Sequence, residues 1–299
     1  MRSKLFQFKT QLQYRLVQAK SVYQEFRLYD FGSYALNRLT PRQGYTVEND
    51  LAYGANERHQ LDLYRTAQPR PQQPLIVFVH GGAWSRGDKK DYRFVGEAFA
   101  QQGFDVAVIN YQLAPQNIFP VYIDDLTLAL NYLHDQQAEL RINTDQIILM
   151  GHSAGAFNIM SVLYHPQPYA LNCRDNIRAA IGLAGPYHFD YKDDPLCADA
   201  FDQTIPYHDV MPYYFVESNH IRHYLLVAEN DQIVHLSNAV DFDHVLNKHG
   251  NHSQLITISR TGHVSIMGSV SSLFSRYFKT KHTIMQALEE TPKSRVVSL

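Results

Sequence analysis

The sequence has few cysteines, little net charge and no long apolar segment near its start, and each of these shortages excludes a class of protein. Its 299 residues contain two cysteines, Cys173 and Cys197, too few for a disulfide framework and without the spacing of a metal site. The net charge is −2, so no field of one sign would recruit nucleic acid. No early segment is apolar for long enough to be a secretory signal or a membrane-spanning helix. We therefore expect a cytoplasmic protein with reduced thiols and no nucleic acid, metal or cofactor. A single bridge between the two cysteines is the alternative for an exported protein.

The length and composition predict one domain with an insertion. Hydrophobic residues make up 45% of the chain, enough to fill a single large core. Strand-like apolar runs alternate with helix-like segments, which is typical of a mostly parallel sheet covered by helices. The expected strands are 61–64, 75–79, 104–111, 147–150, 179–183, 224–228 and 255–258, and the expected helices are 92–102, one that begins at Pro120 and one after Asp231.

A glycine-flanked serine follows one of these strands. Residues 151–155 are Gly-His-Ser-Ala-Gly, between the apolar run 146–150 and a helix-like stretch. A serine at such a sharp turn has a strained backbone, and the positions two residues away must lack side chains to avoid collision. This pattern predicts a nucleophile elbow at Ser153. A helix N-cap is the alternative role for that serine, but the symmetric glycines and the preceding strand favour the nucleophile.

A second motif follows an earlier strand. Residues 80–84 are His-Gly-Gly-Ala-Trp, directly after the buried-strand pattern of 74–79, where a Gly-Gly loop can turn its N–H groups toward an oxyanion. With both motifs, the chain resembles the α/β-hydrolase superfamily over about residues 45–278. The resemblance is to serine esterases of the HGGxW/HGGG type, which include carboxylesterases related to hormone-sensitive lipase, kynurenine formamidases and isoprenylcysteine methylesterases. It implies an α/β-hydrolase fold with a mostly parallel central sheet, flanking helices and a small lid-like insertion.

The resemblance also predicts a catalytic triad. A serine hydroxyl is a poor nucleophile at neutral pH, so Ser153 needs a base, and the base needs an orienting carboxylate. In this fold the chain order is serine, acid, histidine. Asp231 follows a late strand and His263 follows the last one, at the places where the family carries its acid and base.

Each of these assignments has a competitor. Glu229 precedes Asp231 by two residues but is closer to the strand, so we expect it to point elsewhere. The sequence has fifteen histidines, and only His263 has the required position. Surface positions are expected for the histidines in or beside the helix after the acid, which are His235, His244, His249 and His252.

Backbone amides are the expected oxyanion donors. The Ala154 N–H begins a helix and has no intrahelical acceptor. By resemblance, the N–H groups of Gly82 and Ala83 supply the other donors. Ala83 stands where the HGGG esterases have a third glycine, and we expect it to keep its donor if its φ is negative.

Three residues are candidates for the substrate pocket. Trp84 either packs under the oxyanion loop or forms a pocket wall. His152 adjoins the nucleophile, and Tyr187 opens a stretch of about 186–220 whose length and proline content predict a lid-like insertion. Aromatic residues of that insertion either form an apolar pocket or hold it onto the sheet.

The two ends of the chain differ from the hydrolase domain, which is expected over residues 41–280. Residues 1–40 form a separate segment, in which 1–27 combine six basic residues with apolar residues at near-helical spacing. Two interpretations are open for this segment: peripheral contact with an anionic membrane surface, or packing on the catalytic domain. Residues 281–299 are assigned to a C-terminal tail.

These features predict a carboxylic ester hydrolase that forms an acyl-enzyme on short-chain or small esters, without a cofactor. An arylformamidase that cleaves N-formylkynurenine is the alternative, because ester and amide cleavage use the same groups. A non-catalytic binding protein on the hydrolase fold is the third hypothesis, although such proteins usually lose a triad residue.

Overall fold

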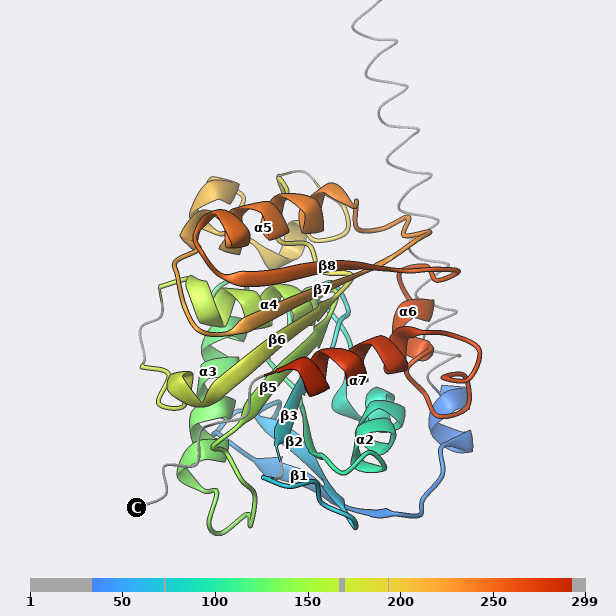
Figure 1. The fold of residues 1–299 in the computed structure, drawn as a ribbon. Coiled ribbons are helices and arrows are strands. Elements are labelled where there is room, and N and C mark those ends of the chain that lie inside the picture. Colours follow the sequence, from blue (N-terminus) through green and yellow to red (C-terminus); the bar gives the residue numbers. More distant parts are fainter. Residues whose placement is uncertain (1–33, 73, 167–169, 193, 292–299) are drawn as a thin grey trace, which may run out of the picture.

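A single twisted sheet organises the part of the chain that the structure describes (Figure 1). The computed structural model describes residues 34–72, 74–166, 170–192 and 194–291. Its eight strands have the order β1-β2-β4-β3-β5-β6-β7-β8. Strand β2 is antiparallel to β1 and β4, and all later pairs are parallel. The strands are β1 (Tyr45–Ala52), β2 (Gln60–Thr66), β3 (Leu75–Val79), β4 (Asp105–Ile109), β5 (Ile147–His152), β6 (Ile177–Leu183), β7 (Arg222–Ala228) and β8 (His252–Ile258).

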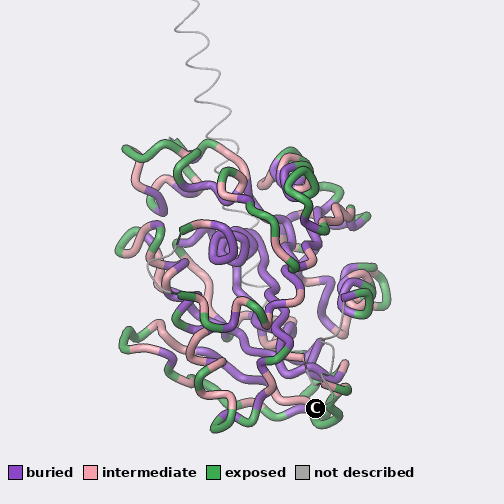
Figure 2. Tube along the Cα trace, turned by 60° about the vertical axis from the view of Figure 1, so that its left-hand side comes forward, coloured by how far each residue is buried: buried purple, intermediate pink, exposed green. Residues whose placement is uncertain are grey.

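Helices cover both faces of this sheet. Along β3, Leu75, Val77 and Val79 join the core that contains residues of α3, α4 and α5, whereas Ile76 and Phe78 join the core that contains residues of α2, α6 and α7. This alternation explains why the strand is apolar throughout, since both of its faces are buried; Figure 2 shows buried chain running through the centre of the molecule. The α-helices that lie wholly within the described residues after β1 are α2 (Arg93–Ala100), α3 (Val121–Asp135), α4 (Ala154–Tyr164), α5 (Ser237–Lys248), α6 (Ser265–Gly268) and α7 (Thr280–Glu290).

The parallel strands bring the predicted motifs together. Strands β3, β5, β7 and β8 run parallel, so their carboxyl ends lie on the same side of the sheet and the four segments that follow them meet there. Parallel α/β sheets carry their ligand sites at the carboxyl ends of their strands. The predicted α/β fold with a mostly parallel, helix-flanked sheet is confirmed.

The connection from β6 to β7 is irregular. The described residues of 186–220 contain no strand and no α-helix, only the short 3-10 turns η3 (Ala198–Ala200), η4 (Tyr207–Asp209) and η5 (Pro212–Phe215). A small insertion therefore replaces a regular strand-and-helix unit, as expected.

Two elements differ from the sequence analysis. Strand β1 was not predicted, because it lies at the sheet edge and most of its residues are exposed. Residues 281–290, assigned to a tail, belong to α7, and Ile284, Ala287 and Leu288 are buried on one side of that helix. Their helical spacing ties the segment to the core.

The N-terminal basic segment, residues 1–27, lies outside the described residues. Among the residues that are described, no helix combines the length and apolarity needed to cross a membrane. Cys173 and Cys197 are both buried and unbridged.

Candidate active site

Ser153 occupies a sharp turn between β5 and α4. Its φ of 52° and ψ of −119° lie in a region that costs about 1–3 kcal/mol for a residue with a side chain. The flanking glycines leave room for this turn: a Cβ on Gly151 would lie 2.3 Å from Gly155 O, and a Cβ on Gly155 would lie 2.1 Å from Val79 O. The Ser153 side chain makes no capping hydrogen bond to α4, so its hydroxyl is free of the N-cap role.

The three residues expected to act together form a chain of hydrogen bonds. Ser153 Oγ lies 2.8 Å from His263 Nε2, and His263 Nδ1 lies 2.9 Å from Asp231 Oδ2. His263 is only 1% exposed, so water barely competes for its ring. The other Asp231 oxygen, Oδ1, accepts from the backbone N–H groups of Ile233 and Val234, at 2.9 Å each. The loop after β7 thus fixes the carboxylate, and the carboxylate fixes the imidazole.

The electrostatics of Asp231 keep it ionised. Burial raises the pKa of its carboxyl, but the hydrogen bond from His263 and the backbone N–H groups of Val234 and Ile233 outweigh burial and hold the pKa below its usual value. Glu229, the competing acid, accepts instead from the backbone N–H of Arg260 at 2.7 Å. Glu229 therefore stabilises the backbone of the loop after β8 and takes no part in the chain of hydrogen bonds between Ser153, His263 and Asp231.

The loop after β3 turns back on itself through an unusual backbone. Gly82, Ala83 and Trp84 have φ values of 128°, 49° and 58°, and Gly82 O accepts from the N–H groups of Ser85 and Arg86 at 3.1 and 3.2 Å. The negative φ on which the Ala83 donor was made conditional is not found, since Ala83 and Trp84 are both left-handed within this tight turn around Gly82 O.

Three amides near Ser153 have no acceptor within the described protein. These are the N–H groups of Gly82, Ala83 and Ala154, the residues expected as oxyanion donors. A backbone N–H group without an acceptor can donate to a negatively charged oxygen. Gly81, which precedes two of these donors, lies against Ser153, since a Cβ on Gly81 would be 3.1 Å from Ser153 Cβ.

Two buried histidines near this site are neutral. Burial, together with the smaller effect of the nearby His263, lowers the pKa of His152 to about 3. His152 Nε2 lies 2.9 Å from His263 O, so it supports the backbone of the predicted base. Burial likewise lowers the pKa of His80 to about 4, and this ring stacks on Tyr111 with centroids 4.4 Å apart.

The other two pocket candidates are packed into the protein. Trp84 donates its indole N–H to Asn158 Oδ1 at 2.9 Å and meets the rings of Phe157 and Phe201 edge-on, so it packs under the loop. Tyr187 is buried and stacks on Phe242 with centroids 4.7 Å apart. Neither lines the cavity of about 120 Å³ beside the predicted acid, whose walls include Ala184, Gly185, Asp231, Val234 and Leu236.

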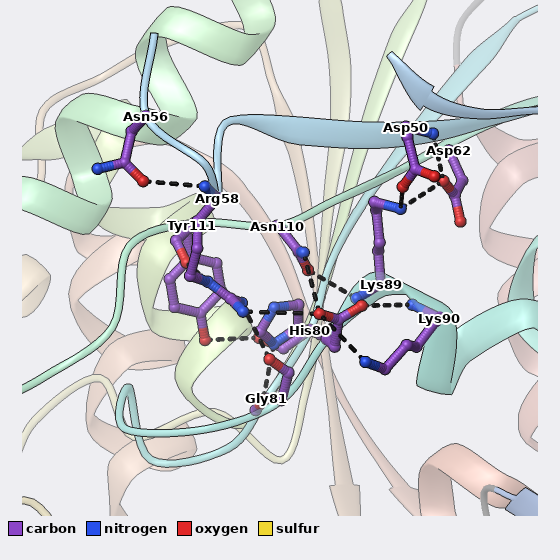
Figure 3. A network of polar contacts seen from close by, with 12 residues as sticks. Asp50, Asn56, Arg58, Asp62, His80, Gly81, Lys89, Lys90, Asn110 and Tyr111 are labelled. Carbon is purple, nitrogen blue, oxygen red and sulfur yellow. Dashed lines mark hydrogen bonds and ion pairs between the residues drawn. The ribbon is translucent and has the colours of Figure 1, made fainter. Parts of the chain in front are cut away.

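Sequence reasoning missed the residues that support this loop from behind. Asn158 is one of them, and the available signal was the lone amide side chain in the mostly apolar α4. Arg58 and Asn110 are others, and the sequence analysis gave neither residue a role in the site (Figure 3). No group of three or more His, Cys, Asp or Glu side chains in the described part of the chain is arranged to hold a metal ion.

Two family models match the chain. The BD-FAE model matches residues 61–166, and the prolyl oligopeptidase family model matches residues 120–281. The second match covers more than half of the chain and contains the segments that follow β5, β7 and β8.

Several proteins of similar sequence are named as formamidases or methylesterases. A kynurenine formamidase from Drosophila melanogaster is 32% identical over 149 residues, which are 50% of this chain and 48% of the relative. A probable isoprenylcysteine alpha-carbonyl methylesterase from Oryza sativa subsp. japonica is 30% identical over 152 residues, or 48% of this chain and 36% of the relative. The matched region thus spans about half or less of these relatives' length.

Several solved structures with a similar fold are named as esterases. Esterase B from Lactobacillus rhamnosis matches with a TM-score of 0.73 and 18% identity, covering 93% of this chain and 94% of that one. A bacterial heroin esterase matches with a TM-score of 0.71 and 18% identity, covering 89% and 91%. At such identities the likeness concerns the fold alone. Together with the family models, it confirms the resemblance: the chain belongs to the α/β-hydrolases, and within them to the prolyl oligopeptidase family.

Proposed function

We propose that this protein is a serine hydrolase that cleaves short-chain or small carboxylic esters through an acyl-enzyme. The observation that carries the proposal is the chain of hydrogen bonds Ser153–His263–Asp231, next to the unpaired N–H groups of Gly82, Ala83 and Ala154. The esterases that share the fold and the methylesterase and formamidase relatives support it.

In the first half of the proposed reaction, Ser153 Oγ attacks the ester carbonyl carbon while His263 Nε2 accepts the hydroxyl proton. The carbonyl oxygen becomes an oxyanion, to which the three backbone N–H groups donate. Asp231 holds the imidazole and stabilises its positive charge. When the tetrahedral intermediate collapses, the C–O bond to the alcohol breaks, and His263 gives the proton to the leaving oxygen.

In the second half, water replaces the alcohol. His263 accepts a proton from the water molecule as the water oxygen attacks the acyl carbon, and the same N–H groups stabilise the second oxyanion. The bond to Ser153 Oγ then breaks, the proton returns to that oxygen and the carboxylic acid leaves. Each N–H donor lost from such a site typically costs about 3–4 kcal/mol, so loop geometry matters nearly as much as the base.

Ser153→Ala tests this function. We expect turnover of p-nitrophenyl acetate to fall by about 10⁶-fold, and mass spectrometry of the wild-type protein treated with an aryl phosphonate to place the adduct on Ser153. Ser161→Ala is the matched control, because Ser161 is likewise buried, lies in α4 and has a hydroxyl without a partner among the described residues. An adduct on another residue, or an active Ser153→Ala variant, would refute the proposal.

Arylformamidase activity is the second candidate, and the Drosophila relative named kynurenine formamidase favours it. Turnover of N-formylkynurenine is compared with that of p-nitrophenyl esters from acetate to palmitate. The ester proposal predicts the highest kcat/KM on short acyl esters, because the insertion is small. A higher value on N-formylkynurenine would favour the formamidase. A folded protein that turns over neither substrate would favour the binding protein.

A further inference from the structure

The segment that carries two of the proposed oxyanion donors is held in a costly shape. Ala83 and Trp84 both have φ near +50°, and each such residue costs about 1–3 kcal/mol unless its surroundings impose it. The loop therefore needs contacts from outside. The following inference rests on the proposed function and concerns where those contacts come from.

Arg58, in the turn between β1 and β2, reaches the far end of this loop (Figure 3). Its Nη2 donates to Gly87 O at 2.9 Å, and its Nε donates to Tyr111 O at 2.7 Å. Its Nη1 also lies 3.6 Å from Asp88 Oδ2. The side chain is 23% exposed, so most of it is shielded from water. One planar guanidinium thus joins three segments in a fixed geometry that a lysine cannot reproduce.

The residue that Arg58 holds lies directly against the base of the loop. A Cβ on Gly87 would be 2.6 Å from both Gly81 O and His80 Nδ1. The backbone at Gly87 is therefore in close contact with residues 80 and 81, and no side chain lies between them. Tyr111, the second partner of Arg58, donates its hydroxyl to His80 O at 3.0 Å. Any shift of Gly87 or Tyr111 is therefore transmitted to His80 and Gly81, which immediately precede the Gly82 and Ala83 amides.

A second anchor holds the segment from Lys89 onward without Arg58. Asn110 Oδ1 accepts from the backbone N–H of Lys89 at 2.6 Å, and the Lys89 ammonium pairs with Asp50 and Asp62. Because this anchor remains when Arg58 is replaced, the loop keeps its place in the fold while losing the contact that sets Gly87.

We propose that Arg58 is a positioning residue for catalysis, which directs the Gly82 and Ala83 amides at the oxyanion by holding Gly87 and Tyr111. It touches neither the substrate nor the reacting atoms. A displacement of about 1 Å in such a site costs up to roughly 100-fold in rate, so the contact has a measurable effect on kcat.

Arg58→Met tests the proposal with p-nitrophenyl acetate, with active sites counted by the burst of an aryl phosphonate. We expect kcat per titrated serine to fall by about 10- to 100-fold with little change in KM. A merely structural role would lower the number of titratable sites and leave kcat per site unchanged. Arg58→Lys, which keeps one donor for Gly87 O or Tyr111 O, is expected to be intermediate.

Arg65→Met is the matched control. Arg65 also bridges distant segments, through Glu48 and the Arg141 carbonyl, but it lies away from the loop, so kcat should be retained. If kcat per site in Arg58→Met stays within twofold of wild type, the proposal is wrong. If Arg58→Met does not fold, Arg58→Lys decides by the same measure. A wild-type protein that is not labelled on Ser153 would instead overturn the proposed function, and this inference with it.

Discussion

Replacing Asp231 by asparagine gives a direct test of the predicted acid. Asp231 Oδ1 accepts from two backbone N–H groups, and Oδ2 faces His263 Nδ1. A carboxamide in this place keeps its oxygen toward the two N–H donors, so its NH₂ group points at the imidazole. His263 Nδ1 must then act as an acceptor, and the ring proton moves to Nε2, which faces Ser153 Oγ at 2.8 Å. In that tautomer the imidazole cannot take the serine proton.

The expected loss in kcat follows from the free energy needed to turn the carboxamide around. Flipping the carboxamide would restore the tautomer but leave the Ile233 and Val234 N–H groups unpaired, at about 1–3 kcal/mol each. The total of about 2–6 kcal/mol corresponds to a loss of roughly 30-fold to 10⁴-fold in kcat. The upper end agrees with the loss of about 10⁴ typical of a wrong histidine tautomer.

Steady-state hydrolysis of p-nitrophenyl acetate at neutral pH measures the effect. Glu229→Gln is the control, since its side-chain oxygen can still accept from Arg260 N–H, and kcat should stay within about twofold of wild type. If Asp231→Asn loses less than tenfold, or if Glu229→Gln loses as much, the acid has been misassigned.

Three further predictions concern stability and the thiols. Burial lowers the pKa of His223 to about 4, below its unfolded value of about 6.5, so the unfolded state binds more protons and stability falls as the pH drops from 6.5 toward 4. Chemical denaturation should show that wild type loses up to about 3 kcal/mol more than His223→Gln over this range, and equal losses would contradict the assignment. Gly155→Ala should lower stability by about 1–3 kcal/mol or more, since its Cβ would overlap Val79 O. Gly268→Ala is the control and should leave stability unchanged, because the nearest atom to its Cβ would be 3.6 Å away. Thermal melts compare the two variants. Burial raises the pKa of the Cys173 thiol to about 12 and that of Cys197 further, so iodoacetamide should modify neither in the native protein and both after denaturation, and fast native modification would refute their burial.

The sequence predicted the parts of the fold that depend on residue type. Strand β3 could be located because both of its faces are buried, which requires five consecutive apolar residues. Strand β1 could not, because an exposed edge strand has no such requirement. The glycines around Ser153 indicated the elbow, since the close contacts there admit no side chain.

Contacts between distant segments were beyond this reasoning. Nothing about an alanine indicates a positive φ at Ala83; that conformation depends on its neighbours in the folded chain. Arg58 and Gly87 are separated by 29 residues, and a sequence pattern does not show that they meet. The sequence could therefore indicate which residues are candidates for the chemistry, while the contacts that hold them in place became visible only in three dimensions.

The close contact between the start of α4 and the end of β3 affects which changes of sequence the site can tolerate. Gly155 rests on the carbonyls of Val79 and His80 with no side chain between them. The distance from Ser153 to the loop after β3 is thus set by direct contact between two backbone segments. Side-chain changes in other parts of the molecule can therefore accumulate while this spacing stays constant. A chemical centre built in this way lets new specificities arise without re-adjusting the distances on which bond cleavage depends.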